Sequence, residues 1–293
     1  MNIRIIARLD IKGPNLVKGI HLEGLRVLGT PEVFAKYYYQ NGADELFYQD
    51  VVASLYDRNS LHDIITKTAK EIFIPLTVGG GIRNLEDISN VLRAGADKIA
   101  INTSAIKNPE FIKEASRKYG SSTIVVVIEA IKQNDGKYLA YTDNGRNHTG
   151  IEVTSWAKKV EELGAGEIVI TSVDKEGTGS GFDIELTKEI SAIVSIPVIA
   201  HGGCGKQEHI SEAIISGKAD AVAIASILHY NCLRADIELF KNSKEGNIEF
   251  LKNGNISSKV TPQNLTSIKK YLKDCGVDVR YNNEGARDER QKV

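Results

Sequence analysis

An internal repeat constrains the fold of this chain more than any other feature of its sequence. The segment 75–104 (PLTVGGGIRNLEDISNVLRAGADKIAINTS) aligns with 197–226 (PVIAHGGCGKQEHISEAIISGKADAVAIAS) when one residue is inserted near Lys218. Two further pairs of segments align at nearly the same offset, 41–50 with 163–172 and 5–12 with 125–132. Three matches in the same order predict that the chain consists of two equivalent halves.

Each half alternates short apolar runs with segments of helical periodicity. The runs are rich in β-branched residues and occupy 5–10, 45–50, 74–80 and 98–102, then 123–129, 167–173, 196–203 and 221–225. Such runs suit parallel strands that are covered by helices on their outer face. Segments 84–95 and 207–217 have apolar residues at helical spacing and a glycine at their end. Eight strands with eight helices predict a closed (β/α)8 barrel, the TIM barrel, built from two duplicated half-barrels; an open doubly wound sheet is the alternative if the repeat is accidental.

The length of 293 residues fits one such barrel. We expect residues 1–281 to form a single domain, with an insertion near 241–263 before the last helix and a polar, disordered tail at 282–293. The formal net charge of −1 points neither to nucleic acid nor to an anionic membrane, so an anionic ligand must be bound by local groups. No segment resembles a signal peptide or a membrane span, and we therefore expect a cytoplasmic protein.

The three cysteines argue against a disulfide framework and against structural zinc. Cys204, Cys232 and Cys275 are an odd number and show neither a CxxC motif nor a Cys/His ligand spacing. No carboxylate or histidine cluster has the spacing of a metal site either. We therefore expect reduced thiols, no bound metal and a reaction that needs no cofactor.

Glycine-rich strand ends in both halves predict two anion-binding cradles. The motifs VGGGI (78–82) and AHGGCG (200–205) expose backbone amides at the barrel face where TIM-barrel active sites lie. In each half the following strand ends at a small hydroxyl residue, which adds a further hydrogen-bond donor. Two cradles at one mouth imply a substrate with two phosphates. The predicted contacts are Gly81, Asn102 and Thr103 in the first half, and Gly203, Ala225 and Ser226 in the second.

Those glycines have a structural alternative, because they also relieve crowding where helices pack on strands; their duplication favours the binding role. Gly177, in the loop DKEGTGSG, is predicted to complete the second cradle, and a flexible loop explains it almost as well. Lys18, in the long segment after the first strand, is predicted to contact substrate when that segment closes as a lid. A solvated loop lysine is the alternative.

Two carboxylates take equivalent positions in the two halves. Asp10 is predicted to end the first strand and Glu129 the fifth, so that they face each other between the cradles. Paired carboxylates in different surroundings can divide acid and base duties, because their environments move their pKa values apart. Either residue alone is explained as an ordinary polar group at a strand end. Their symmetry favours a catalytic pair.

The same residues resemble those of the cyclase subunit of imidazole glycerol phosphate synthase. The resemblance covers about residues 1–230 and returns at 271–280, and it rests on the motifs RIIARLDIK, VKG, DELFYQD, TVGGGI, KIAINTSA, GAGEI and TSVDKEGT. It implies a lyase of histidine biosynthesis that uses ammonia from a glutaminase subunit. The substrate would be an aminoimidazole carboxamide ribonucleotide with two phosphates (PRFAR), and the products imidazole glycerol phosphate and AICAR. Asp10 would be the general base.

The resemblance also implies an ammonia gate at the opposite, N-terminal barrel face. Arg4, Glu45, Lys98 and Glu167 match the ring of charges that gates this entrance in the family, each at the start of a strand. A solvated barrel bottom is the structural alternative for any one of them. All four together imply a glutaminase docked at this face, near Asp97 and Lys98.

Several departures from the family pattern keep other functions open. The family has an aspartate at the position of Glu129, and small residues at the positions of Arg8 and His201. Segment 241–263 is an insertion relative to the family pattern. These differences motivate a second hypothesis, a paralogous ammonia-channelling subunit that amidates another acceptor, such as a nucleotide-linked or surface-polysaccharide sugar. The retained Asp10 and cradles argue against an idle scaffold for a glutaminase. The four gate-like charges argue against an isomerase of the same two-phosphate barrel group.

Overall fold

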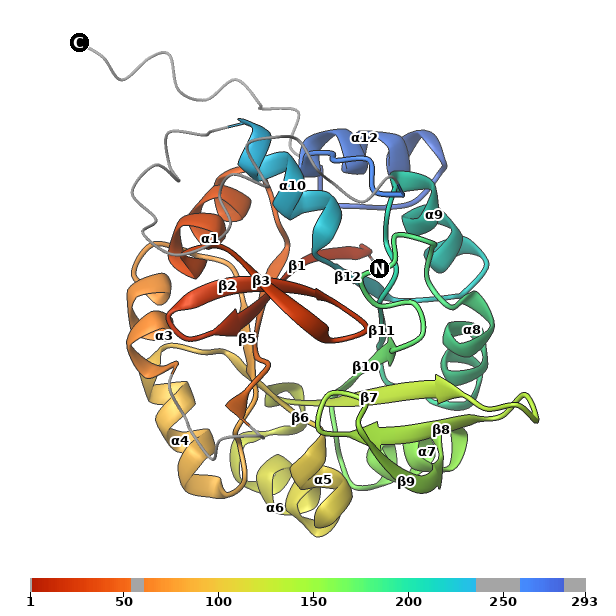
Figure 1. The fold of residues 1–293 in the computed structure, drawn as a ribbon. Coiled ribbons are helices and arrows are strands. Elements are labelled where there is room, and N and C mark those ends of the chain that lie inside the picture. Colours follow the sequence, from red (N-terminus) through yellow and green to blue (C-terminus); the bar gives the residue numbers. More distant parts are fainter. Residues whose placement is uncertain (1, 54–60, 236–258, 282–293) are drawn as a thin grey trace.

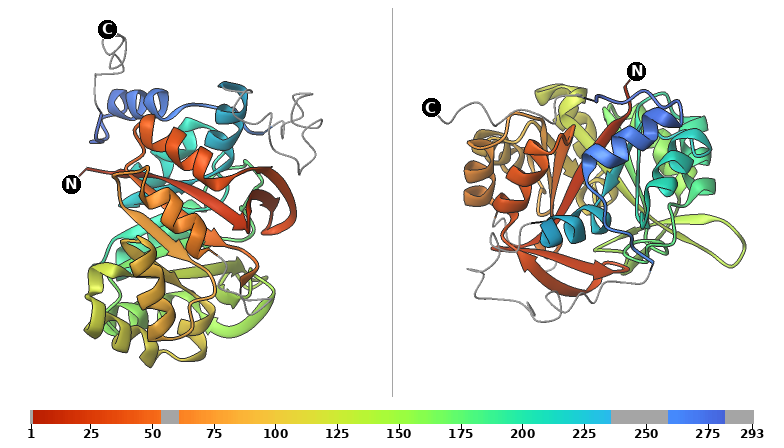
Figure 2. Two further views of the ribbon diagram at one scale, coloured as in Figure 1. Left: turned by 90° about the vertical axis from the view of Figure 1, so that its left-hand side faces the viewer. Right: turned by 90° about the horizontal axis from the view of Figure 1, so that it is seen from above.

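Eight parallel strands close into a barrel with helices around its outside (Figures 1 and 2). The computed structural model describes residues 2–53, 61–235 and 259–281. The barrel strands are β1 (Arg4–Lys12), β4 (Glu45–Asp50), β5 (Leu76–Gly79), β6 (Lys98–Ile101), β7 (Ile124–Lys132), β10 (Glu167–Ser172), β11 (Val198–His201) and β12 (Ala221–Ile224). Each pairs with its neighbour in parallel, and β12 pairs with β1 to close the ring. The predicted TIM barrel and all eight predicted strands are confirmed.

Helices cover the outer face of the strands. They are α1 (Pro31–Gln40), α3 (His62–Ala69), α4 (Leu85–Ala94), α5 (Thr103–Lys107), α6 (Glu110–Tyr119), α7 (Val153–Glu162), α8 (Ile184–Ile193), α9 (Gln207–Ile215), α10 (Ser226–Ala235) and α12 (Leu265–Asp274), with a 3-10 turn, η1, at Ser121–Thr123. Helix α4 ends as expected, because Gly95 takes the left-handed region at φ 118°. At its start Asn84 accepts from two amides of the first turn. No helix in the described ranges is long and apolar enough to cross a membrane.

The end of α9 differs from the prediction. Gly217 was expected to terminate this helix as Gly95 terminates α4, but the left-handed residue is Lys218, at φ 59°. Gly217 is required for another reason, because a Cβ there would collide with the carbonyl of Ala213. The single inserted residue of the second half therefore moves the helix-terminating conformation one position along the chain.

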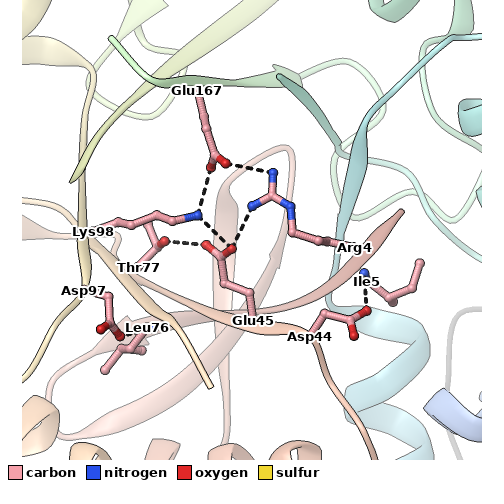
Figure 3. Close-up of polar contacts among 9 residues, drawn as sticks. All are labelled: Arg4, Ile5, Asp44, Glu45, Leu76, Thr77, Asp97, Lys98 and Glu167. Carbon is pink, nitrogen blue, oxygen red and sulfur yellow. Dashed lines mark hydrogen bonds and ion pairs between the residues drawn. The ribbon is translucent and has the colours of Figure 1, made fainter. Parts of the chain in front are cut away.

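A repeated carboxylate clamp joins neighbouring strands at the N-terminal face (Figure 3). Asp44 accepts from the amide of Ile5 at 2.8 Å, and Asp97 accepts from that of Leu76 at 2.8 Å. Asp220 accepts from the amide of Val198 at 2.9 Å. The fourth equivalent position is Gly166. Its amide donates to the carbonyl of Ile124, as the amides of the three aspartates donate to their partner residues, but it has no side chain to accept a second bond. These clamps fix the spacing of the strand starts, where the predicted gate lies.

The predicted lid is an antiparallel hairpin, and so is its counterpart in the second half. Strand β1 continues into β2 (Asn15–Ile20) and β3 (Glu23–Gly29), and β7 continues into β8 (Tyr138–Thr142) and β9 (Asn147–Glu152). We call these the first and second hairpins. The first crosses the barrel mouth (Figure 1), at the end of the barrel opposite the N-terminus (Figure 2, right).

The hairpins correct two of our predictions. Lys18 lies on a strand of the first hairpin and not in an irregular loop. Asp10 and Glu129 do not end their strands, because β1 runs on to Lys12 and β7 to Lys132 in order to pair with the hairpins. The predicted tail, 282–293, and most of the predicted insertion, 241–263, lie outside the described residues.

Candidate functional site

Two cavities at the barrel mouth divide the predicted contacts between them. A cavity of 290 Å³ is lined by Gly81, Asn102, Thr103 and Glu129. A second, of 20 Å³, is lined by Lys18, Gly177, Gly203, Ala225 and Ser226. The structure thus brings the contacts predicted for each half together, in two separate places. Asp10 is not among the described residues that line either cavity.

The backbone of the two cradles is duplicated as closely as the sequence. Gly80 and Gly81 have φ values of 99° and 72°, and Gly202 and Gly203 have values of 98° and 99°. All four are in the left-handed region, which strains other residues. A Cβ on Gly80 would also collide with the carbonyl oxygen of Asp50 on β4, and a Cβ on Gly202 would collide with that of Ser172 on β10. The structural explanation therefore applies, because these glycines relieve crowding. The turns that they form face the two cavities, and the binding role stays a prediction.

The first cavity carries basic side chains that the sequence did not single out. Arg83 and Lys107 line it together with Gly81 and Thr103. Arg83 is held by a bond from its guanidinium to the carbonyl of Ala53, 3.1 Å long. These cations make the first cavity suitable for an anionic group. Arg83 follows the VGGGI motif directly, and Lys107 lies in the last turn of α5, so only the fold relates them to one cradle.

Lys18 is buried beside the second cradle and is ion-paired. Its Nζ lies 2.6 Å from Glu176 Oε1 and 2.8 Å from the carbonyl of Gly19. The other carboxylate oxygen of Glu176 accepts from the amide of Leu22 at 3.1 Å. Glu176 therefore closes the first hairpin over the second cavity. Gly177 allows the first hairpin to approach this closely, because a Cβ at position 177 would collide with the carbonyl of Gly19.

Glu129 lies at the edge of the first cavity with little solvent contact. Its Oε2 accepts from the amide of Gly145, in the second hairpin, at 2.8 Å. Burial raises the pKa of Glu129 to about 7, against the opposing effects of the Gly145 amide, the Arg8 guanidinium and the Asn102 side chain. A carboxyl group with this pKa exchanges protons readily near neutral pH.

Asp10 has a different set of neighbours. Its Oδ1 lies 2.9 Å from the Nε of Arg8, and both side chains are buried. The Arg8 Nη1 lies 3.3 Å from His201 Nδ1, which also lies 3.1 Å from Thr171 Oγ1. Burial, with the charges of Arg8 and Lys18, holds the pKa of His201 well below its usual range. Two of the departures from the family pattern, Arg8 and His201, are thus in contact with each other, and Arg8 also contacts the predicted catalytic residue Asp10.

The four predicted gate residues form one closed ring of ion pairs (Figure 3). Arg4 lies 2.9 Å from Glu45 and 2.8 Å from Glu167, and Lys98 lies 3.0 Å and 3.1 Å from the same two carboxylates. Burial lowers the pKa of Arg4, but Glu167 and Glu45 outweigh it and raise the pKa above its usual value. Thr77 donates to the second oxygen of Glu45 at 2.5 Å, a contact that the sequence did not indicate. The ring is closed across the start of the barrel.

An apolar interior separates this ring from the barrel mouth. The inward-facing side chains between the two are buried and make up one cluster: Ile6, Phe47, Ala100, Val125, Val127, Val169, Ile199, Ala221 and Ala223. Such a lining favours a small neutral molecule over an ion, because a charge would lose its hydration there.

Comparison with known proteins identifies the family. Residues 4–234 match the family model described as "Histidine biosynthesis protein". The chain belongs to this family. Residues 4–234 contain the ring of charges, both cradles and both carboxylates, so the match covers the whole candidate site.

Individual relatives within the family agree with one another. The chain is 58% identical over 210 residues to "Imidazole glycerol phosphate synthase subunit HisF" of Legionella pneumophila, covering 72% of this chain and 99% of the relative. It is 52% identical over 246 residues to the protein of the same name from Methanocaldococcus jannaschii, covering 78% and 90%. The protein of that name from Methanococcus vannielii is 48% identical over 265 residues, covering 83% and 96%. The resemblance inferred from the sequence motifs is therefore confirmed.

Proposed function

We propose that this protein is the cyclase subunit of imidazole glycerol phosphate synthase, a lyase of histidine biosynthesis. It uses ammonia to cleave the two-phosphate aminoimidazole carboxamide ribonucleotide and to close the imidazole ring. The observation that carries the proposal is the arrangement along one barrel axis. A closed ring of charges lies at one end, an apolar interior follows, and paired cradles with two carboxylates lie at the other end.

The cradles offer hydrogen-bond donors for the two phosphates of such a substrate. Backbone amides and the hydroxyls of Thr103 and Ser226 bind phosphate without a basic side chain. The first cavity has room for a phosphate as it stands, whereas 20 Å³ holds about one water molecule. The second phosphate therefore requires the first hairpin to withdraw and the pair of Lys18 with Glu176 to separate. Lys18 then becomes free to bind the phosphate.

The ring of charges supports a glutaminase partner at the N-terminal face. Ammonia from glutamine reaches the mouth only if Arg4 and Lys98 separate from Glu45 or Glu167, because the ring closes the start of the barrel. A partner that contacts this face can move one member of the ring when its own site is occupied. Ammonia then crosses an interior that excludes ammonium and water by its apolar lining.

The decisive experiment supplies the purified protein with an ammonium salt and the two-phosphate aminoimidazole substrate. We expect imidazole glycerol phosphate and AICAR to form at equal rates without a glutaminase. No ring closure at saturating ammonia would refute the proposed function. Turnover of a sugar acceptor under the same conditions would support the paralogous alternative instead.

The gate is tested separately with Lys98→Met, which removes two ion pairs and keeps the length of the side chain. We expect the glutamine-driven rate with the glutaminase bound to fall about tenfold or more, while the ammonia-driven rate stays within about twofold. Lys158→Met, an exposed lysine on α7, is the matched control. Equal losses in both rates would show that Lys98 does not act in ammonia transfer.

A further inference from the structure

Arg8 occupies a position on the reaction path that neither cradle nor gate explains. It lies on β1 between the apolar interior and the carboxylates, and it lines the first cavity. Its guanidinium carbon lies 5.4 Å from the centre of the Phe47 ring, which is part of the apolar interior. The side chain is 4% exposed. A buried guanidinium is costly unless its donors are satisfied, so its partners determine its role.

The partners of Arg8 hold it in one orientation. Arginine only donates hydrogen bonds, so His201 Nδ1, 3.3 Å from Nη1, must be the unprotonated nitrogen of a neutral ring. The bond from Nε to Asp10 Oδ1, 2.9 Å long, lies on the other side of the guanidinium. The Phe47 ring adds a cation–π contact. Strands β1, β4 and β11 together fix the guanidinium.

The two carboxylates consequently differ in how accessible they are to a substrate. One oxygen of Asp10 is occupied by the Arg8 Nε, and Asp10 is not among the described residues that line a cavity. Glu129 lines the 290 Å³ cavity, and its Oε2 accepts from the backbone amide of Gly145. A substrate in the first cavity therefore meets Glu129 without displacing an ion pair. The extra methylene of Glu129 relative to the family aspartate extends it further toward that cavity.

We propose that Arg8 is a positioning residue that reserves Asp10 as its ion-pair partner and leaves Glu129 as the group that exchanges a proton with the substrate. This proposal rests on the proposed function, and it changes the general-base role that the family resemblance gives to Asp10. In the step concerned, the ammonia nitrogen forms a new bond to carbon, and a carbon–nitrogen bond of the substrate breaks. Protonated Glu129 gives its proton to the departing nitrogen, and its carboxylate then takes one from the nitrogen that has been added.

The charged and titratable groups near this pair come from several elements. Glu129 faces Arg8 of β1 and Asp143 of the second hairpin, and Asp143 opposes ionisation of Glu129. Asp10 faces Arg8, and its charge also acts on His229 of α10. Lys18 of the first hairpin acts on both His201 and His229. The lining of the first cavity further contains Asp50, Arg83 and Lys107.

The test is the pH dependence of ammonia-driven turnover at constant free ammonia. In the wild type we expect the rate to fall above about pH 7, as Glu129 loses its proton, so that the pH–rate profile has a descending alkaline limb. Glu129→Gln should abolish this limb and lower the rate by about a hundredfold or more. Asp10→Asn should lower the rate but keep the limb. Arg8→Met should lower kcat about tenfold with little change in KM, and should move the limb to higher pH because a cation near Glu129 is gone.

Two further variants separate positioning from space filling. Arg8→Lys keeps the charge, and we expect it to restore the wild-type position of the limb. Arg93→Met, an exposed arginine on α4, should change neither rate nor profile. A limb that disappears in Asp10→Asn and persists in Glu129→Gln would overturn the proposal. So would an Arg8→Met profile that coincides with that of the wild type.

A measurement without turnover keeps this result separate from the proposed function. Difference infrared spectroscopy should show a carboxyl group titrating near pH 7 in the wild type. It should be absent from Glu129→Gln and shifted upward in Arg8→Met. If the wild type fails to close the ring but shows this titration, the proposed function is wrong and the arrangement of charges is correct. If the titration is missing or belongs to Asp10, the assignment of Arg8 and Glu129 is wrong whatever the substrate.

Discussion

The two hairpins at the barrel mouth follow one plan but are fastened by different chemistry. The tip of the first crosses to the loop after β10, where His21 Nδ1 lies 2.8 Å from the carbonyl of Val173. The tip of the second crosses to the loop after β4, where Asn144 donates to the carbonyl of Val51 at 2.6 Å. Val51 and Val173 occupy equivalent places in the repeat. Each half of the barrel therefore closes the other.

The difference lies in the second contact of each tip. In the first hairpin Glu176 accepts from Leu22 and pairs with Lys18, so a buried ion pair holds the hairpin against the opposite half. In the second hairpin the amide of Gly145 donates to Glu129 of its own half. The first arrangement makes a latch, and the second contacts the proposed acid/base group. The two halves thus share one scaffold but differ in the side chains that fasten their hairpins.

The largest effect is expected from breaking the latch with Glu176→Gln. Lys18 would be left buried without a counter-charge, which costs about 3 to 5 kcal/mol unless the hairpin opens. We therefore expect opening, with amide hydrogen exchange at His21 and Leu22 faster by about a hundredfold or more. Glu162→Gln, which removes an exposed pair with Lys159, should cost less than about 0.5 kcal/mol. Unchanged exchange at His21 and Leu22 would show that Glu176 does not hold the hairpin.

Glu129→Gln should have the next largest effect on stability, and its sign depends on pH. The pKa of Glu129 is raised from 4.5 in its unperturbed state to about 7, so the folded protein binds more protons than the unfolded one between these values. Wild-type stability consequently falls as pH rises through this window. The variant has no carboxyl group to ionise at this position. Its free energy of unfolding should therefore be higher than that of the wild type by about 3 kcal/mol at pH 8, with no difference from this source below about pH 4.5. Denaturant unfolding of both proteins at several pH values measures it, and a pH-independent difference would contradict the raised pKa.

The smallest effect is expected from removing the side chain at each hairpin tip. His21 and Asn144 both have positive φ, at 51° and 61°, so glycine is the replacement that adds no backbone strain. Asn144→Gly and His21→Gly should each cost about 1 kcal/mol, the value of one hydrogen bond. Similar losses would confirm that the tips are equivalent and that the latch makes the difference between hairpins. A loss at Asn144 as large as that at Glu176 would contradict this.

The repeat explains why so much of the fold was predictable from the sequence. Parallel barrel strands are continuous apolar runs, and the glycine pairs require a left-handed backbone that few other residues adopt, so both leave clear patterns in the sequence. The alignment of 5–12 with 125–132 is one residue out at the carboxylates, because it pairs Asp10 with Ala130. The strand register makes Asp10 and Glu129 equivalent, since Asp10 pairs with Gln49 and Glu129 with Thr171. The four gate residues were each expected at a strand start, and the closure of the barrel brings them into one ring.

Contacts between distant side chains were not predictable in the same way. Glu176 closes on Lys18 across 158 positions of sequence, and Arg8 reaches His201 across 193. No periodic pattern records such pairs, because each depends on the direction of a single side chain inside the closed barrel. The extension of β1 and β7 beyond the carboxylates was missed for a related reason: their last residues pair with the hairpins, and only Ile11 and Ala130 among them also pair with a barrel strand.

The central claim is that the two halves form one site for one substrate, and a crystal structure with the two-phosphate aminoimidazole substrate bound tests it most directly. We expect one phosphate at Gly81 and Thr103 and the other at Gly203 and Ser226. We also expect the first hairpin to be displaced and Lys18 to be separated from Glu176. Both phosphates within one half, or a second cradle left closed by the intact ion pair, would refute a shared site.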